Sequence, residues 1–263
     1  MNNRKYDTSI QRKMGFYGAI FWMLFLCACG GGSAEPTLTG SIWFIINPKV
    51  GTAPVELNSS YVYDNEAGNE FRISKFRQYI SGIKLYQEGG KEVNIPINSA
   101  SDGIYLIDAA DRDSYSFELS NIPEGNYNRI SFLVGIDEQS LGDIPRTGML
   151  SPSGGIFLDG TANYLHWEFE GTSSASPLEN EQIAFRAGGA NSLYRADIIF
   201  GSDVARIRQD QSPVVELNAD IAQMFSSPQL VDFSSSPQIL DISQSQQMAQ
   251  QFANGVNYDH LHN

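Results

Sequence analysis

The chain has 263 residues and a formal net charge of −13, with 30 acidic against 17 basic side chains. A surface this acidic argues against binding to nucleic acid and to anionic membrane surfaces. The two cysteines, Cys27 and Cys29, both lie near the N-terminus. Beyond residue 29 the chain therefore has no thiol, which excludes disulfides, thiolate metal sites and cysteine nucleophiles from the folded part.

The N-terminal segment has the pattern of a bacterial secretion signal. Basic residues come first, at positions 4, 5, 12 and 13, and an apolar run of 14 residues follows at 15–28. At ~1.5 Å per residue this run is too short to cross a ~30 Å hydrocarbon core comfortably, so it favours a signal h-region over a transmembrane helix. The order Leu26-Cys27-Ala28-Cys29 resembles a lipobox. It predicts a lipoprotein signal peptide at 1–28, with an uncleaved anchor or an ordinary signal peptide as the alternative.

Cleavage before Cys29 would leave a lipidated cysteine at the new N-terminus. A diacylglyceryl group plus an amide-linked acyl chain supplies more than one buried chain, which stable anchoring requires. Residues 29–38, rich in Gly, Ser, Ala, Pro and Thr, then form a flexible tether. We therefore expect attachment through the lipid in the cell envelope, at the outer membrane, on either its periplasmic or its surface face.

After residue 38, short β-rich runs alternate with turn residues, which is the all-β pattern. The expected strands are 39–46, 61–63, 70–73, 76–86, 103–107, 114–119, 127–136, 163–170, 182–185, 193–200 and 214–217. Hairpin turns are expected at 65–69 and 88–91. The pattern predicts one domain at 39–263, an antiparallel β-sandwich with short C-terminal helices.

Residues 163–170 alternate strictly between apolar and polar side chains. Leu165, Trp167 and Phe169 would face the core, and the opposite face, with His166, would meet water or a site.

The C-terminal segment has helical spacing instead. Asn218 can cap a short helix, and apolar residues at 239–253 recur with helical spacing before Asn254-Gly255 ends the pattern.

Few residues could carry chemistry. The sequence has three histidines and none of the common catalytic or phosphate-binding motifs, so we expect a binding protein and not an enzyme. In an extended segment His260 and His262 would face the same way, so both could bind one metal ion, with Asp259 orienting or joining them. The alternative is a disordered polar tail. His166 could be a third ligand, or a hydrogen-bonded surface histidine.

Several segments, taken in order, resemble the MbnP-like family of secreted copper-associated proteins. They are 71–85 (FRISKFRQYISGIKL), 105–108 (YLID), 122–127 (IPEGNY), 132–137 (FLVGID), 147–150 (TGML), 164–171 (YLHWEFEG), 188–189 (GG) and 259–262 (DHLH). The resemblance implies a β-rich envelope protein that binds copper. It also implies a dihaem peroxidase-like partner, which in some members oxidises a tryptophan near the metal.

The chain departs from the family pattern at the expected metal site. The stretch 156–164 (IFLDGTANY) contains no tryptophan, where many relatives have two. A histidine often found before the Gly-Gly pair corresponds to Arg186 or Ala187, and another corresponds to Asn47-Pro48. The resemblance therefore implies copper binding or handling at a reduced site that keeps His260 and His262, and His166, which is not part of the family pattern, could join them. The alternative is an envelope binding or scaffold module that kept the fold and lost the metal.

Overall fold

The computed structural model describes residues 37–158 and 162–263. The predicted signal peptide at 1–28, the lipidation site Cys29 and the tether up to residue 36 lie outside the described residues. Residues Thr37–Asn263 form one compact unit. Within the described ranges, none of the helices is long and apolar enough to cross a membrane.

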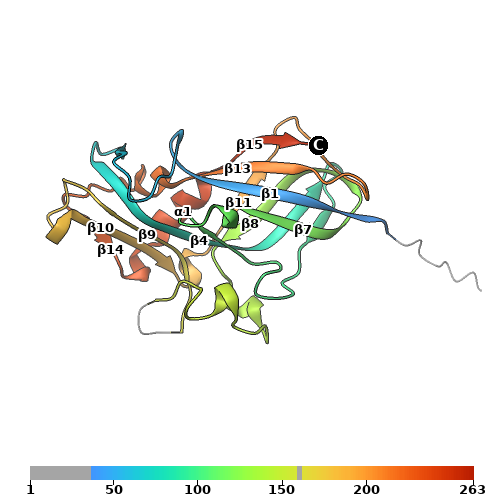
Figure 1. Ribbon diagram of the computed structural model, residues 1–263, viewed down its shortest axis with the longest axis horizontal. Helices are drawn as coiled ribbons and strands as arrows, with labels where there is room; N and C mark the ends of the chain where they lie inside the picture. The colour runs from blue at the N-terminus through green and yellow to red at the C-terminus, as the bar shows by residue number, and fades with distance from the viewer. Residues whose placement is uncertain (1–36, 159–161) are drawn as a thin grey trace, which may run out of the picture. The chain divides into compact units, whose positions relative to one another are not determined.

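The first sheet holds five strands in the order β15-β13-β1-β2, with β7 also paired to β1. They are β1 (Thr39–Val50), β2 (Ala53–Pro54), β7 (Ser116–Pro123), β13 (Val214–Asp220) and β15 (Val256–His262). β1 and β13 run parallel, and the other pairs run antiparallel. β15 therefore forms an edge of this sheet, outside β13 and β1 (Figure 1).

The second sheet holds ten strands around the long central strand β4 (Glu70–Gln87). The others are β3 (Tyr63–Asp64), β5 (Glu92–Asn94), β6 (Tyr105–Asp108), β8 (Gly125–Val134), β9 (Leu165–Thr172), β10 (Gln182–Gly188), β11 (Tyr194–Ile199), β12 (Ala205–Ile207) and β14 (Gln238–Ile239). β4 pairs with β9 through residues 72–78 and with β8 through residues 80–87. Gly82, at φ +54°, lies where the pairing with β8 shifts register, and its conformation suits the irregular backbone there.

The two sheets pack as a sandwich-like all-β fold, which confirms the fold class expected from the sequence. The main hydrophobic cluster takes side chains from both sheets, including Phe44 and Leu217 from the first and Phe76 and Phe132 from the second. The expectation of purely antiparallel sheets is wrong, because β1–β13 and β10–β14 are parallel pairs. No hairpin joins strands so far apart in the sequence, so the turn pattern does not fix their direction.

The alternation expected at residues 163–170 holds only in part. Trp167 and Phe169 are fully buried in the main cluster. Leu165 belongs instead to a second cluster, because the pairing of β9 with β10 skips His166. An extra residue of this kind is a bulge, which re-aims the neighbouring side chains.

The opposite face of β9 is also covered. Tyr164, His166 and Glu168 are only 4%, 2% and 7% exposed. Side chains from the connection between β8 and β9 form the second cluster with Tyr164, namely Ile136, Leu141, Leu150 and Ile156. The expectation that this face meets water or a site therefore fails as regards water for these three residues, because the long connection folds back over them, whereas the side chain of Glu170 is 39% exposed.

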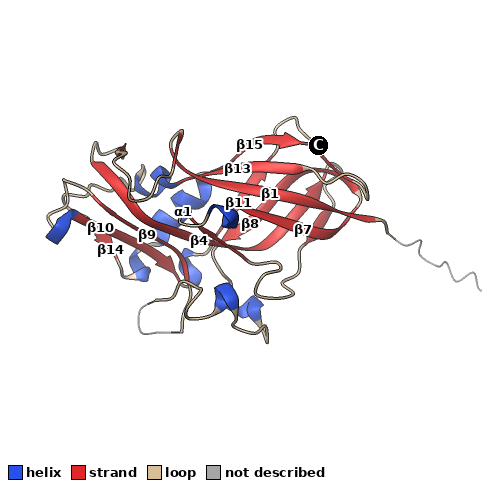
Figure 2. Ribbon diagram, viewed as in Figure 1, coloured by secondary structure: helices blue, strands red, loops and turns tan. Residues whose placement is uncertain are grey.

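Short helices occupy the connections and the C-terminal segment (Figure 2). The α-helix is α1 (Gln246–Asn254), and its Phe252 packs edge-on against Phe76 and Trp167 in the core. The 3₁₀-helices are Arg112–Tyr115, Glu138–Leu141, Gly148–Leu150, Glu179–Glu181, Ala190–Ser192, Ile221–Phe225 and Ile242–Gln244. The expected cap is displaced by two residues, since Asn218 stays in β13 and the side chain of Asp220 caps the helix at Ala222.

Candidate metal centre

Strand pairing brings two of the predicted ligands onto one surface with an acidic residue. In the β13–β15 ladder His260 lies opposite Glu216, and His262 lies opposite Val214. Val215 and Leu217 are fully buried, so the residue between them, Glu216, faces outward. The C-terminal segment is therefore an ordered strand and not the disordered tail that was the alternative, and its two histidines face the same way.

The side chains of Glu216, His260 and His262 converge. One potential ligand atom from each lies within 4.8 Å of the other two. Nε2 of His260 lies 3.3 Å from Oε1 of Glu216. The two imidazole rings stand edge to face, with centroids 4.8 Å apart. The group can offer two nitrogens and one oxygen to a single ion.

Two further side chains hold this group in place. The register between β13 and β15 shifts beside His260, which leaves Asp259 as an extra residue in β15. Its Oδ2 lies 3.2 Å from Nδ1 of His260. From β1, the neighbouring strand on the other side, Nδ2 of Asn47 donates to Oε2 of Glu216 at 3.3 Å.

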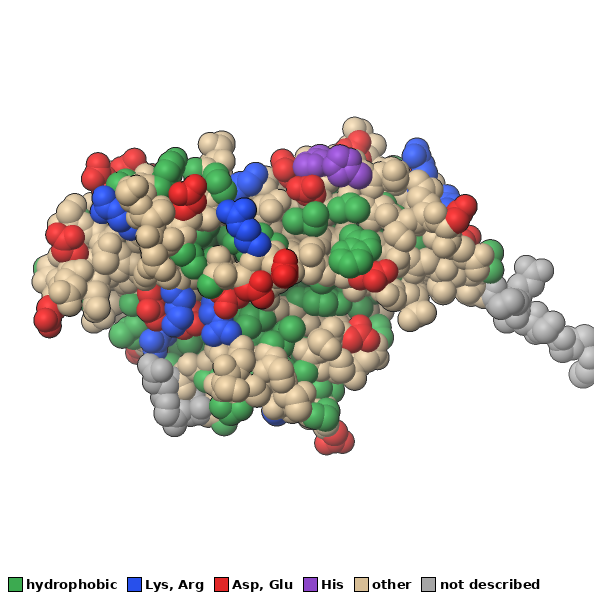
Figure 3. Space-filling view, in the orientation of Figure 1, with side chains coloured by type: hydrophobic (Ala, Val, Ile, Leu, Met, Phe, Trp, Pro, Cys, Tyr) green, Lys and Arg blue, Asp and Glu red, His purple; other side chains and the backbone are tan. Residues whose placement is uncertain are grey.

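The group is open to solvent. The side chain of His260 is 46% exposed and that of Glu216 is 23% exposed. Figure 3 shows the histidine side chains together on the surface near the C-terminal strand, with acidic side chains beside them. An ion from solution can therefore reach the ligand atoms without a change in the fold.

The structure does not bring His166 into this group. It lies on β9 of the second sheet, and Gly135 leaves room for its ring, because a Cβ added at Gly135 would lie 2.5 Å from its Cγ. Its Nδ1 accepts from the N–H of Ile136 at 3.3 Å, and its Nε2 lies 2.9 Å from the carbonyl oxygen of Gly189. A carbonyl only accepts, so Nε2 carries the hydrogen and the ring is neutral.

Burial lowers the pKa of His166, although the carbonyl of Gly189 acts in the opposite direction. A cavity of about 160 Å³ adjoins the ring, and Asp137 and Glu138 help to line it. Both ring nitrogens already have backbone partners, so the ring offers no free ligand atom in this arrangement.

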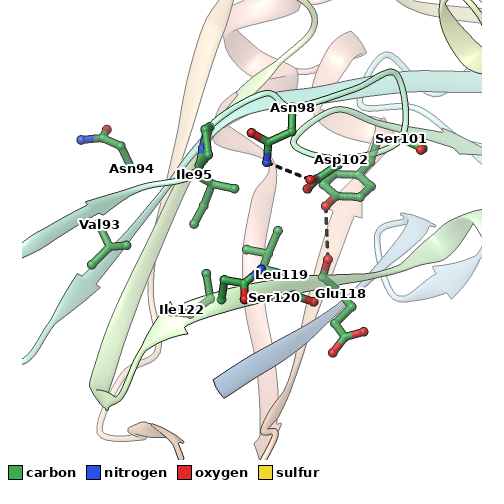
Figure 4. A pocket seen from close by; sticks show the side chains of 13 residues that line it. Val93, Asn94, Ile95, Asn98, Ser101, Asp102, Glu118, Leu119, Ser120 and Ile122 are labelled. Atoms are coloured by element: carbon green, nitrogen blue, oxygen red, sulfur yellow. Dashed lines mark hydrogen bonds between the residues drawn. The ribbon is translucent and has the colours of Figure 1, made fainter. Parts of the chain in front are cut away.

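Two pockets of the described residues lie apart from His260 and His262 and contain no histidine. One of about 360 Å³ lies between the β5–β6 connection and β7 (Figure 4). Asn98 and Asp102 are hydrogen-bonded to each other at its rim, and Leu119 and Ile122 form part of its apolar wall. This pocket contains no histidine, so it does not extend the candidate metal group.

Glu216 was missed from the sequence. The alternation in residues 214–217 already places its side chain opposite to the buried valine and leucine. Nothing in the sequence, however, pairs this strand with residues 256–262, which are separated from it by a helical segment. The sequence therefore indicates on which face of its strand Glu216 lies, but not which residues of other strands lie beside it.

Comparison with known proteins identifies the family of this chain. The sequence profile of the MbnP family matches residues 39–245. That is most of the chain, and the protein belongs to the MbnP family. Among solved structures, MbnP from Methylosinus trichosporium matches with a TM-score of 0.49 and 12% sequence identity, over 79% of this chain and 87% of that chain. Comparison with curated proteins gives no match. His260 and His262 follow the end of the matched range.

Proposed function

We propose that this MbnP-family protein binds copper through Glu216, His260 and His262. The observation that carries the proposal is the β13–β15 pairing, which places the three ligand atoms within 4.8 Å of one another. Imidazole nitrogen is a good copper ligand, and carboxylate oxygen joins it in sites for divalent ions. The proposal assigns binding and handling of the metal, without a reaction catalysed by the protein itself.

The distances fit a single ion with a small adjustment. Metal–nitrogen and metal–oxygen bonds of ~2 Å place two ligands of one ion at most ~4 Å apart. The widest separation in the group, up to 4.8 Å, exceeds this by less than the reach of a side-chain rotation. The partly exposed His260 has space for such a rotation, so strand movement is not required.

The test is a copper titration with matched variants. The parent is the full chain in detergent with Cys27→Ser and Cys29→Ser, so that no thiol competes. We expect the parent to bind one copper ion and His260→Ala/His262→Ala to bind none at micromolar metal. His166→Gln is the matched control, because it removes an imidazole outside the group. Equal uptake by the parent and the double variant would place the copper elsewhere and refute this site, and no uptake by either would favour the metal-free scaffold instead.

We also propose that the native chain is anchored by lipid at Cys29 in the cell envelope. The support is the basic, apolar and Leu-Cys-Ala-Cys order of the first 29 residues. Intact mass measurement of membrane-extracted protein should show acyl chains on an N-terminal Cys29, and Cys29→Ser should be misprocessed or released. A mature chain that begins elsewhere without lipid would refute the anchor and leave the copper proposal untouched.

A further inference from the structure

Glu216 is oriented through both of its oxygens. Oε2 accepts a hydrogen bond from Asn47 on β1, and Oε1 faces Nε2 of His260 on β15 at 3.3 Å. Because β13 pairs with β1 on one side and β15 on the other, the carboxylate is fixed from two strands. One oxygen is therefore occupied by the amide, and the other is directed at the imidazole.

Asp259 orients His260 through the other ring nitrogen, Nδ1, on the side of the ring away from Glu216. A carboxylate only accepts hydrogen bonds, so its contact with Nδ1 favours the tautomer in which Nδ1 carries the hydrogen. Nε2 then presents its lone pair toward Oε1 of Glu216. In this neutral tautomer Nε2 and the carboxylate oxygen can both only accept, so at 3.3 Å they need a proton or a metal ion between them. A carboxylate behind a ligating histidine is also the usual outer partner in metal sites.

The chemistry of these groups distinguishes between the two common oxidation states of copper. The group offers nitrogen and oxygen and contains no sulfur. Thiolate and thioether ligands favour Cu(I), whereas imidazole with carboxylate suits divalent ions. The two carboxylates, Glu216 and Asp259, attract a doubly charged ion twice as strongly as a singly charged one at the same distance. We propose, on the basis of the copper-binding function above, that Glu216 makes this site selective for Cu(II) over Cu(I).

The test compares both ions in the thiol-free parent and in Glu216→Gln. Affinities are measured by competition with chelators specific for each oxidation state, with Cu(I) kept under anaerobic conditions. Loss of Glu216 should weaken Cu(II) binding at least about tenfold, the lower end of what even an outer partner typically costs. Cu(I) affinity should fall less, by about threefold where Cu(II) affinity falls tenfold, because Glu216 attracts a singly charged ion half as strongly. The electron paramagnetic resonance spectrum of Cu(II) should also change in the variant.

Two further variants sharpen the result. Glu118→Gln is the matched control: it removes a charge from a residue paired with Trp43 on the same sheet, without touching the three ligands. It should leave both affinities unchanged. Asp259→Asn should weaken Cu(II) more than Cu(I). Since Asp259 is exposed, this variant remains informative if Glu216→Gln fails to fold.

The outcomes separate the inference from the function on which it rests. Equal losses of Cu(I) and Cu(II) affinity in Glu216→Gln would overturn the selectivity and leave copper binding intact. A parent that binds Cu(I) as tightly as Cu(II) would do the same. A parent that binds neither ion would overturn both proposals.

Discussion

The interior strand β9 and the edge strand β15 each carry histidine, in opposite environments. His166 on β9 is 2% exposed, and both of its nitrogens contact the backbone. The side chain of His260 on β15 is 46% exposed, and its nitrogens face Asp259 and Glu216. The difference teaches that pairing partners decide whether an imidazole can bind an ion. The interior strand supports the fold, and the edge strand carries the candidate chemistry.

Trp167→Ala tests the interior half of this comparison and should have the largest effect. The indole is fully buried and packs edge-on against Phe252 of α1. Removing a large buried aromatic typically costs ~3–5 kcal/mol in the free energy of unfolding. Chemical denaturation with two-state analysis measures it. A loss below ~1 kcal/mol would show that the core does not depend on this face of β9.

Copper binding at the edge strand β15 should give the next largest effect, an increase in the free energy of unfolding. An ion that binds only the folded state at 100 times its Kd adds about 2.7 kcal/mol to the free energy of unfolding. The thiol-free parent should gain this in denaturation curves, and so should His166→Gln. His260→Ala/His262→Ala should gain nothing. A similar gain in the double variant would place the ion elsewhere in the molecule.

His166→Gln should lower stability less, by ~1–3 kcal/mol at neutral pH, because a buried backbone group loses its partner. It should also change the pH dependence. Burial lowers the pKa of His166 below its ordinary 6.5, so below that pH the unfolded chain binds a proton that the folded chain resists. Parent stability therefore falls as pH falls below 6.5, by at most ~1.4 kcal/mol per pH unit for one proton.

Glutamine binds no proton in this range, so the variant lacks that component. The difference in unfolding free energy between parent and His166→Gln should therefore shrink as pH falls from 7.5 to 5.5, as denaturation at several pH values will show. The two proteins share every other side chain, so the contributions of those side chains cancel from the difference. A difference that stays constant with pH would mean that His166 is protonated as easily when folded as when unfolded.

Much of the fold could be predicted because it depends on local pattern. The hairpin turns at 65–69 and 88–91 are confirmed by the pairs β3–β4 and β4–β5. The short strands β2, β5, β12 and β14 are not predicted, since runs of two or three residues carry little periodic signal. The parallel pairs were missed for a different reason: they join distant segments, and a single sequence contains no information on which strands meet.

The part of the candidate site that depends on local spacing was also predictable, and the part that depends on strand pairing was not. The spacing of His260 and His262 predicts that both face one way, and this is what β15 shows. His166, expected as a third ligand on residue type alone, lies outside the group that the structure brings together. Glu216 becomes a companion only through the register of β13 with β15. Similarly, the bulge at His166 cannot be read from an alternation that looks regular in the sequence.

The smallest expected effect is on the stability of the metal-free protein, and it tests directly whether the histidines of β15 serve the metal and not the fold. Without copper, His260→Ala/His262→Ala should change the free energy of unfolding by no more than ~0.5 kcal/mol, the usual range for exposed positions. The contact between His260 and Glu216 is partly exposed, and exposed ion pairs contribute little because water and salt screen them. Leu261, which points to the core between them, keeps the strand docked. Denaturation of metal-free parent and variant measures the difference. A loss above ~2 kcal/mol would mean that these imidazoles hold the edge strand in place, and that loss of copper by the variant reports a lost strand and not lost ligands.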